Sequence, residues 1–100
     1  MTIRHVVLWS LASDDAAEKA EQAAEIARRL NALDGVIPGM TAITAGAEAV
    51  YPGTNADAAV VADFESVAAL EAYQVHPAHV EAAGYIRSVV SGRMAVDFEL

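Results

Sequence analysis

The chain has 100 residues, 55% of them hydrophobic, and a formal charge of −8 at pH 7. This length forms one small domain, so we expect a single domain over residues 1–100. The six basic residues are scattered and give no cationic stripe, which argues against nucleic acid and anionic membranes as partners. The sequence has no cysteine and starts without a signal-peptide pattern, so disulfides are excluded and a cytoplasmic location is expected.

The apolar fraction is high for so small a body. A domain of 100 residues has limited interior volume, and surplus apolar surface is commonly buried against a second copy of the same chain. Composition alone therefore predicts a homodimer.

The N-terminal third predicts a strand followed by a helix. Residues 3–9 are β-branched and aromatic, with apolar side chains at odd and even positions, as in a central strand covered on both faces. Ser13, Asp14 and Asp15 provide capping oxygens, after which apolar residues recur at helical spacing as far as Leu33. Gly35 and the proline that follows predict the end of this helix.

The middle of the chain predicts two further strands. Residues 40–50 are small, apolar and threonine-bearing, which indicates a strand that is irregular near Gly46. Residues 51–55 form a turn cluster, and residues 58–64 are again nearly continuous in apolar side chains.

The C-terminal part predicts two short helices and a last strand. Ser66 is placed to cap a helix through Tyr73, and Pro77 suits the first turn of another helix. Gly92 is expected to end that helix, and residues 94–98 to form the last strand.

This order of elements is βαββ(αα)β, and the connection rules fold it into an α+β, ferredoxin-like subunit. Its four-stranded antiparallel sheet carries the helices on one side. The other face of the sheet is left bare, although Val6 and Leu8 should project there as apolar groups. We therefore expect two copies to pair through the sheet face.

The segment from Ala72 to His79 concentrates the chemistry of the chain. It holds Tyr73, His76 and His79, side chains that exchange protons without a metal or a cofactor. A third histidine, His5, alternates with Val7 and Trp9 on the side of the first strand that should lie under the helices. These residues predict a site but do not name a substrate.

Five segments resemble the Dabb family of stress-responsive dimeric α/β-barrel proteins: residues 3–7, 37–40, 64–66, 72–79 and 96–98. The Tyr-x-x-His-Pro-x-His string at 73–79 is the most distinctive of them. The resemblance implies a ferredoxin-like subunit that pairs face to face into a dimeric α/β barrel.

The resemblance also implies a small-molecule pocket. One plant branch of the family contains cofactor-independent polyketide cyclases with a Tyr and a His as acid/base pair, and the matching positions here are Tyr73 and His79. Further pocket residues are then expected among seven side chains: His5, Val7, Trp9, Ile26, Leu30, His76 and Tyr85. Since the aromatic residues on the first helix of that branch are replaced here by aliphatic ones, the substrate does not carry over.

Three functions stay open. The first is a homodimer that binds a small apolar or carbonyl ligand, or is stress-associated, without catalysis. The second is a cofactor-independent lyase or cyclase acting on a polyketide-like or other carbonyl substrate, and the third is a cofactor-free monooxygenase. Tyr73 and His79 could instead be structural or merely ligand-contacting residues, and His76 an entry residue of the helix. Zinc on His5, His76 and His79 is a weaker alternative because no carboxylate accompanies them, so no metal and no cofactor are expected.

Overall fold

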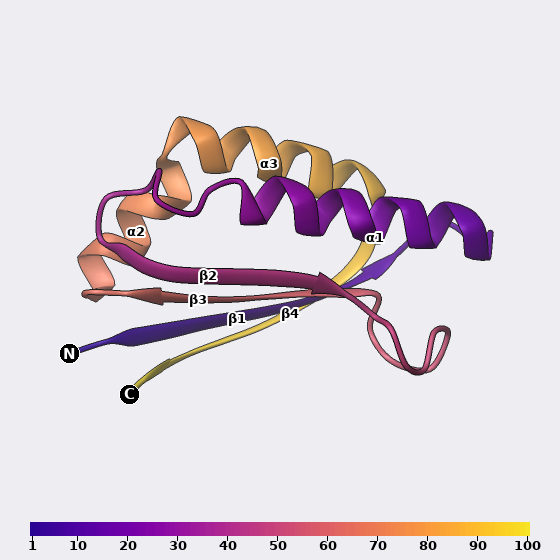
Figure 1. Cartoon of the computed structure of the whole chain (residues 1–100), viewed down its shortest axis with the longest axis horizontal. Helices are drawn as coiled ribbons and strands as arrows, with labels where there is room; N and C mark the ends of the chain where they lie inside the picture. Colours follow the sequence, from indigo (N-terminus) through magenta and orange to yellow (C-terminus); the bar gives the residue numbers. More distant parts are fainter.

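The computed structural model describes all residues from 1 to 100 as a sheet with three helices packed on one face (Figure 1). Its elements follow in chain order: β1 (Ile3–Leu11), α1 (Ala16–Asn31), β2 (Met40–Ala47), β3 (Ala58–Phe64), α2 (Val67–Val75), α3 (Pro77–Val89) and β4 (Val90–Glu99). This is the expected ferredoxin-like order.

The four strands form one antiparallel sheet in the order β2-β3-β1-β4. The prediction of a central first strand is confirmed, because β1 pairs with β3 on one side and with β4 on the other. His5 lies opposite Ala62 on β3 and Asp97 on β4 in this register. The alternation of β1 then places His5, Val7 and Trp9 under the helices, where all three are buried.

Local signals in the sequence explain where α1 begins and how it is held. The carboxylate of Asp15 accepts the backbone N–H of Glu18, as expected of an N-cap. Asn31, the last helical residue, bonds through its side chain to both the N–H and the C=O of Ala45 on β2. The helix is shorter than the apolar spacing predicted, because residues 32–38 form turns before Gly39.

His76 joins α2 to α3 in a single residue. Ser66 caps α2 through its hydroxyl, which accepts the N–H of Ala69. His76 ends α2 with extended backbone and caps α3, since its Nδ1 accepts the N–H of Ala78 at 3.1 Å. Pro77 follows in the first turn of α3, where its missing N–H costs nothing.

Two predicted boundaries are wrong. β2 ends at Ala47, because the carboxylate of Glu48 accepts the N–H groups of Val50 and Tyr51 and so builds the turn. Its irregularity lies between Met40 and Ala42 rather than near Gly46. Gly92 does not end α3; the helix stops at Val89, and Gly92 pairs with Ser10 inside β4.

The two faces of the sheet differ in what covers them. The helix side holds the buried core, whereas no helix covers the outer side (Figure 1). Six large apolar side chains of β1, β3 and β4 lie on that outer face, five of them exposed and Val6 half-buried: Val6, Leu8, Val61, Met94, Val96 and Phe98. We call these six residues the outer apolar face.

Candidate functional site

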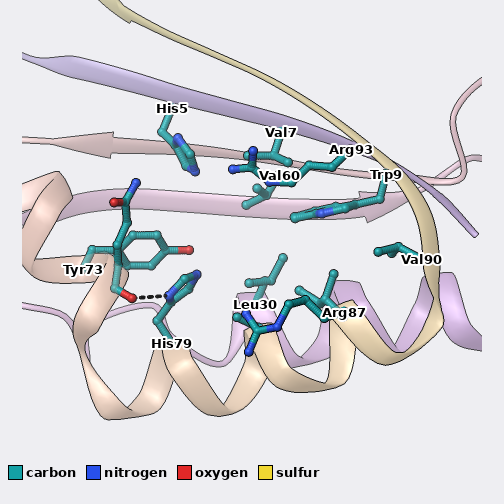
Figure 2. Close-up of a pocket in the computed structure, with 13 residues that line it drawn as sticks. His5, Val7, Trp9, Leu30, Val60, Tyr73, His79, Arg87, Val90 and Arg93 are labelled. Carbon is teal, nitrogen blue, oxygen red and sulfur yellow. Dashed lines mark hydrogen bonds between the residues drawn. The ribbon is translucent and has the colours of Figure 1, made fainter.

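A cavity of about 250 Å³ lies between the sheet and the helices (Figure 2). It is lined mainly by apolar side chains, with a small group of polar ones: His5, Val7, Trp9, Leu30, Val60, Tyr73, Gln74, His79, Ala83, Ile86, Arg87, Val90 and Arg93. Small-molecule sites are typically concave and apolar with a few polar groups that converge on the ligand. The cavity has this character but is slightly smaller than the usual range of about 300–1,000 Å³.

Six of the nine candidate residues line this cavity: His5, Val7, Trp9, Leu30, Tyr73 and His79. They come from β1, α1, α2 and α3, so only the folded chain brings them together.

The other three candidates lie outside it. Ile26 is fully buried in the core beneath α1. His76 uses its ring nitrogen to cap α3. Tyr85 lies against α1, with the guanidinium carbon of Arg29 4.3 Å from the centre of its ring. The sequence pattern could not show that these residues lie outside the cavity, because residues on neighbouring turns of one helix contact different parts of the structure.

His79 presents a nitrogen lone pair to the cavity. Its Nδ1 lies 3.3 Å from the carbonyl oxygen of Gln74. A carbonyl oxygen only accepts hydrogen bonds, so Nδ1 carries the hydrogen and the lone pair is on Nε2. Figure 2 shows the free nitrogen of the ring directed into the cavity.

Burial is the main cause that lowers the pKa of His79 below its ordinary 6.5. Coulombic interactions with His5, Arg87 and Arg93 lower it further, whereas the bond to Gln74 acts in the opposite direction. At neutral pH the imidazole is therefore uncharged and can accept a proton.

Tyr73 offers a hydrogen-bond donor beside this base. Its residue is 1% exposed, and its ring centre lies 4.1 Å from that of His79. Burial alone raises the pKa of the Tyr73 hydroxyl to about 12, with no contribution from any hydrogen bond. Figure 2 shows this hydroxyl pointing into the cavity, so a protonated phenol faces the space that a ligand would fill.

His5 is held by an acidic partner that sequence reasoning missed. Its Nδ1 makes a short hydrogen bond to the carboxylate of Asp97, the residue directly opposite on β4. The ring packs edge-on against Phe64 and Tyr73. The carboxylate therefore orients the imidazole.

Two arginines of the cavity were also missed. Arg87 comes from α3 and Arg93 from β4, and both line the same space as His79. Nothing in their local sequence distinguishes them from surface arginines. The alternation of Arg93 with Asp97 on one face of β4 was the one available signal.

The arrangement can perform proton transfer without a bound group. A neutral imidazole and a protonated phenol lie in contact inside a mostly apolar cavity, which are the two partners that acid–base catalysis needs. No cluster of three or more His, Cys, Asp or Glu side chains in the structure could hold a metal ion. No helix in the structure is both long and apolar enough to cross a membrane.

Comparison with known proteins agrees with the fold. Residues 3–100 match the family model Dabb, described as Stress responsive A/B Barrel Domain. No curated protein matches the chain.

Solved structures give the same result. A dimeric ferredoxin-like protein of unknown function from Thermobifida fusca is 33% identical with a TM-score of 0.83, and the match covers 100% of this chain and 92% of that one. A second dimeric protein of unknown function, from Bacteroides fragilis, is 25% identical with a TM-score of 0.88 and coverage of 99% and 96%. The hydroxynitrile lyase of Passiflora edulis shares the fold at 17% identity, with a TM-score of 0.70 and coverage of 97% and 91%.

Proposed function

Since the chain belongs to the Dabb family of stress-responsive α/β-barrel proteins, we propose that it is a homodimer whose subunits each bind a small carbonyl compound. His79 and Tyr73 then act on this compound as a cofactor-independent acid/base pair, in a lyase or cyclase reaction. The observation that carries the proposal is geometric: the two rings lie in contact in the cavity wall, with their centres 4.1 Å apart, and the Tyr73 hydroxyl and His79 Nε2 face the cavity. The pKa of His79 is lowered and that of Tyr73 is raised to about 12, so both have the protonation state that the chemistry requires.

The chemical step follows from the two atoms that face the cavity. Nε2 of His79 takes a proton from the carbon next to a carbonyl group, and the C–H electron pair forms a C=C bond. The carbonyl π electrons move to oxygen, which accepts a hydrogen bond from the Tyr73 hydroxyl. In a cyclase the resulting enolate adds to a second carbonyl group, whose π electrons move to oxygen, and this oxygen takes the proton from His79. The reverse sequence breaks a C–C bond in a lyase.

If these two residues had a purely structural role, we would expect different hydrogen bonding. A buried tyrosine kept for packing usually bonds its hydroxyl to a protein group. Here no hydrogen bond contributes to the pKa of the Tyr73 hydroxyl, and the hydroxyl points into the cavity. His79 does bond locally to Gln74, but that bond leaves Nε2 free. The unpartnered groups favour a role towards a ligand.

Deuterium exchange tests the proposal without knowledge of the natural substrate. The probe is 4-phenyl-2-butanone in D2O near neutral pD, and proton NMR follows the loss of its hydrogens next to the carbonyl. We expect the protein to accelerate exchange above buffer. His79→Asn and Tyr73→Phe should each lower the accelerated rate by about 10²-fold or to the buffer level, since a base or an oxyanion donor contributes at least this much.

Two matched controls separate catalysis from folding. His76→Asn removes a histidine of the same segment outside the cavity and keeps a good N-cap residue, and Tyr51→Phe removes an exposed phenol. Both should exchange the probe like the wild type. No acceleration by the wild type, or full acceleration in both cavity variants, would contradict the proposal. Oxygen uptake in the same incubations would instead indicate a monooxygenase.

A further inference from the structure

The positive charges of this chain are distributed unevenly between surface and cavity. Four of the six basic side chains lie within ion-pair distance of a carboxylate: Arg4, Lys19, Arg28 and Arg29. The remaining two, Arg87 and Arg93, have no such partner, and both line the cavity that holds His79. In a chain with a net charge of −8, the only unpaired arginines therefore meet at one site.

Their placement fits a shared ligand group. Both residues line the cavity, and Figure 2 shows Arg93 on its sheet side and Arg87 on its helix side. Both residues are exposed, so their guanidinium groups lie where the cavity opens to solvent, whereas Val7, Trp9 and Leu30 are buried. The cavity thus has a cationic opening and an apolar interior.

We propose that the ligand of this cavity is a carboxylate with an apolar body, its anionic group bound between Arg87 and Arg93. The body lies against Val7, Trp9 and Leu30, and a carbonyl group would then sit near His79 and Tyr73. Guanidinium groups bind carboxylates through paired, charge-assisted hydrogen bonds, which supports this assignment. The inference uses the cavity of the proposed function and makes an oxo acid the substrate class.

The otherwise acidic chain strengthens the argument. A net charge of −8 repels anions in general, so an anionic ligand needs a local positive field to be captured. Arg87 and Arg93 supply this field at the cavity, and both of their charges reach His79 strongly enough to lower its pKa. No acidic side chain lines the cavity to oppose them.

Binding of hexanoate and hexanamide tests the assignment directly. The two probes have the same number of heavy atoms and differ in charge. By calorimetric or NMR titration at low salt, we expect hexanoate to bind about tenfold more tightly than hexanamide to the wild-type protein. The double variant Arg87→Met, Arg93→Met should lose this preference, because methionine keeps an apolar stem without the charge.

Arg28→Met is the matched control, since Arg28 is a partly exposed cation on α1 outside the cavity. It should keep the tenfold preference. Equal or undetectable binding of both probes by the wild type, or a preference that survives in the double variant, would overturn the proposal. A melting curve confirms that each variant is folded.

The measurement also separates this inference from the proposed function. It records binding and no turnover, so His79→Asn should still prefer hexanoate even if no carbonyl chemistry exists. Conversely, deuterium exchange without any carboxylate preference would support the acid/base pair and contradict only the proposed anion site.

Discussion

The same buried environment shifts the pKa values of His79 and Tyr73 in opposite directions. Desolvation disfavours the charged form of any titratable group, which means a neutral imidazole for histidine and a protonated hydroxyl for tyrosine. Burial accordingly lowers the pKa of His79 and raises that of Tyr73 to about 12. Burial is thus the largest cause of both shifts, and it leaves a base and a hydrogen-bond donor side by side.

These directions predict the pH dependence of the exchange reaction. The active form needs His79 neutral and Tyr73 protonated. The protein-catalysed rate should therefore rise through an apparent pKa below 6.5, the ordinary value for histidine, and then stay level over the neutral and mildly alkaline range. Rates of 4-phenyl-2-butanone exchange, corrected for the buffer at each pH, provide the measurement. A rise centred above pH 7, or a fall between pH 8 and 10, would contradict the assignment.

The predictable and unpredictable parts of the site differ in how far apart their residues lie in the sequence. Tyr73 and His79 belong to one short segment, so the sequence shows them together and the structure brings their rings into contact. Asp97 meets His5 only because β4 pairs with β1, across 92 positions of the chain. Arg93 lines the cavity through the same pairing, and its alternation with Asp97 along β4 does not by itself show which side of the sheet it faces.

At the scale of elements, the position of α2 depends on a glycine at the start of β2. Gly39 has φ +82°, and a Cβ placed there would lie 2.7 Å from the Cβ of Ala69 on α2. The backbone N–H of Glu65, just before α2, donates to the carbonyl of Gly39 at 2.9 Å. Because α2 carries Tyr73, this close approach also places a residue of the cavity.

Gly39→Ala should therefore destabilise the fold and disturb the site. We expect it to lower the free energy of unfolding by about 3 kcal/mol, from left-handed strain and steric overlap together. Gly35→Ala is the matched control, since Gly35 has φ +77° and nothing within 4 Å of an added Cβ. That variant should lose only about 1 kcal/mol. Urea unfolding at one protein concentration measures both, and equal losses would show that the contact with Ala69 does not matter.

The elements themselves were mostly predictable, because caps and turn residues are local. The predicted helix starts are confirmed at Asp15, Ser66 and Pro77. The start of β4 was not predictable in this way. Gly92 reads as a helix end, but pairing with β1 extends the strand back to Val90, and the register shifts between Ser10 and Leu11 to allow it. Long-range pairing here outweighs the local preference of glycine.

At the scale of the whole molecule, the outer apolar face is an apolar surface that the single chain leaves uncovered. Val6 lies between Val61 and Val96 in the register, so three valines form a row across β3, β1 and β4. Beside them, Arg4 and Asp63 form a bidentate ion pair with distances of 2.8 and 2.9 Å, and the arginine lowers the pKa of the carboxyl group. This face can be covered without leaving a charge unpaired, which agrees with the dimeric state of the solved relatives.

Val61→Asp tests whether this face joins two copies. A carboxylate in the middle of the valine row would be buried without a cation if the sheets pair, so we expect the wild type to be a dimer at micromolar concentration and the variant a monomer. Sedimentation velocity measures both. Val50→Asp, which places the same charge in the exposed turn after β2, should remain dimeric. Since the cavity lies on the opposite side of the sheet, the monomeric variant should still bind hexanoate if it stays folded. A wild type that sediments as a monomer would contradict the dimer itself, and a dimer unaffected by Val61→Asp would place the subunit contact elsewhere.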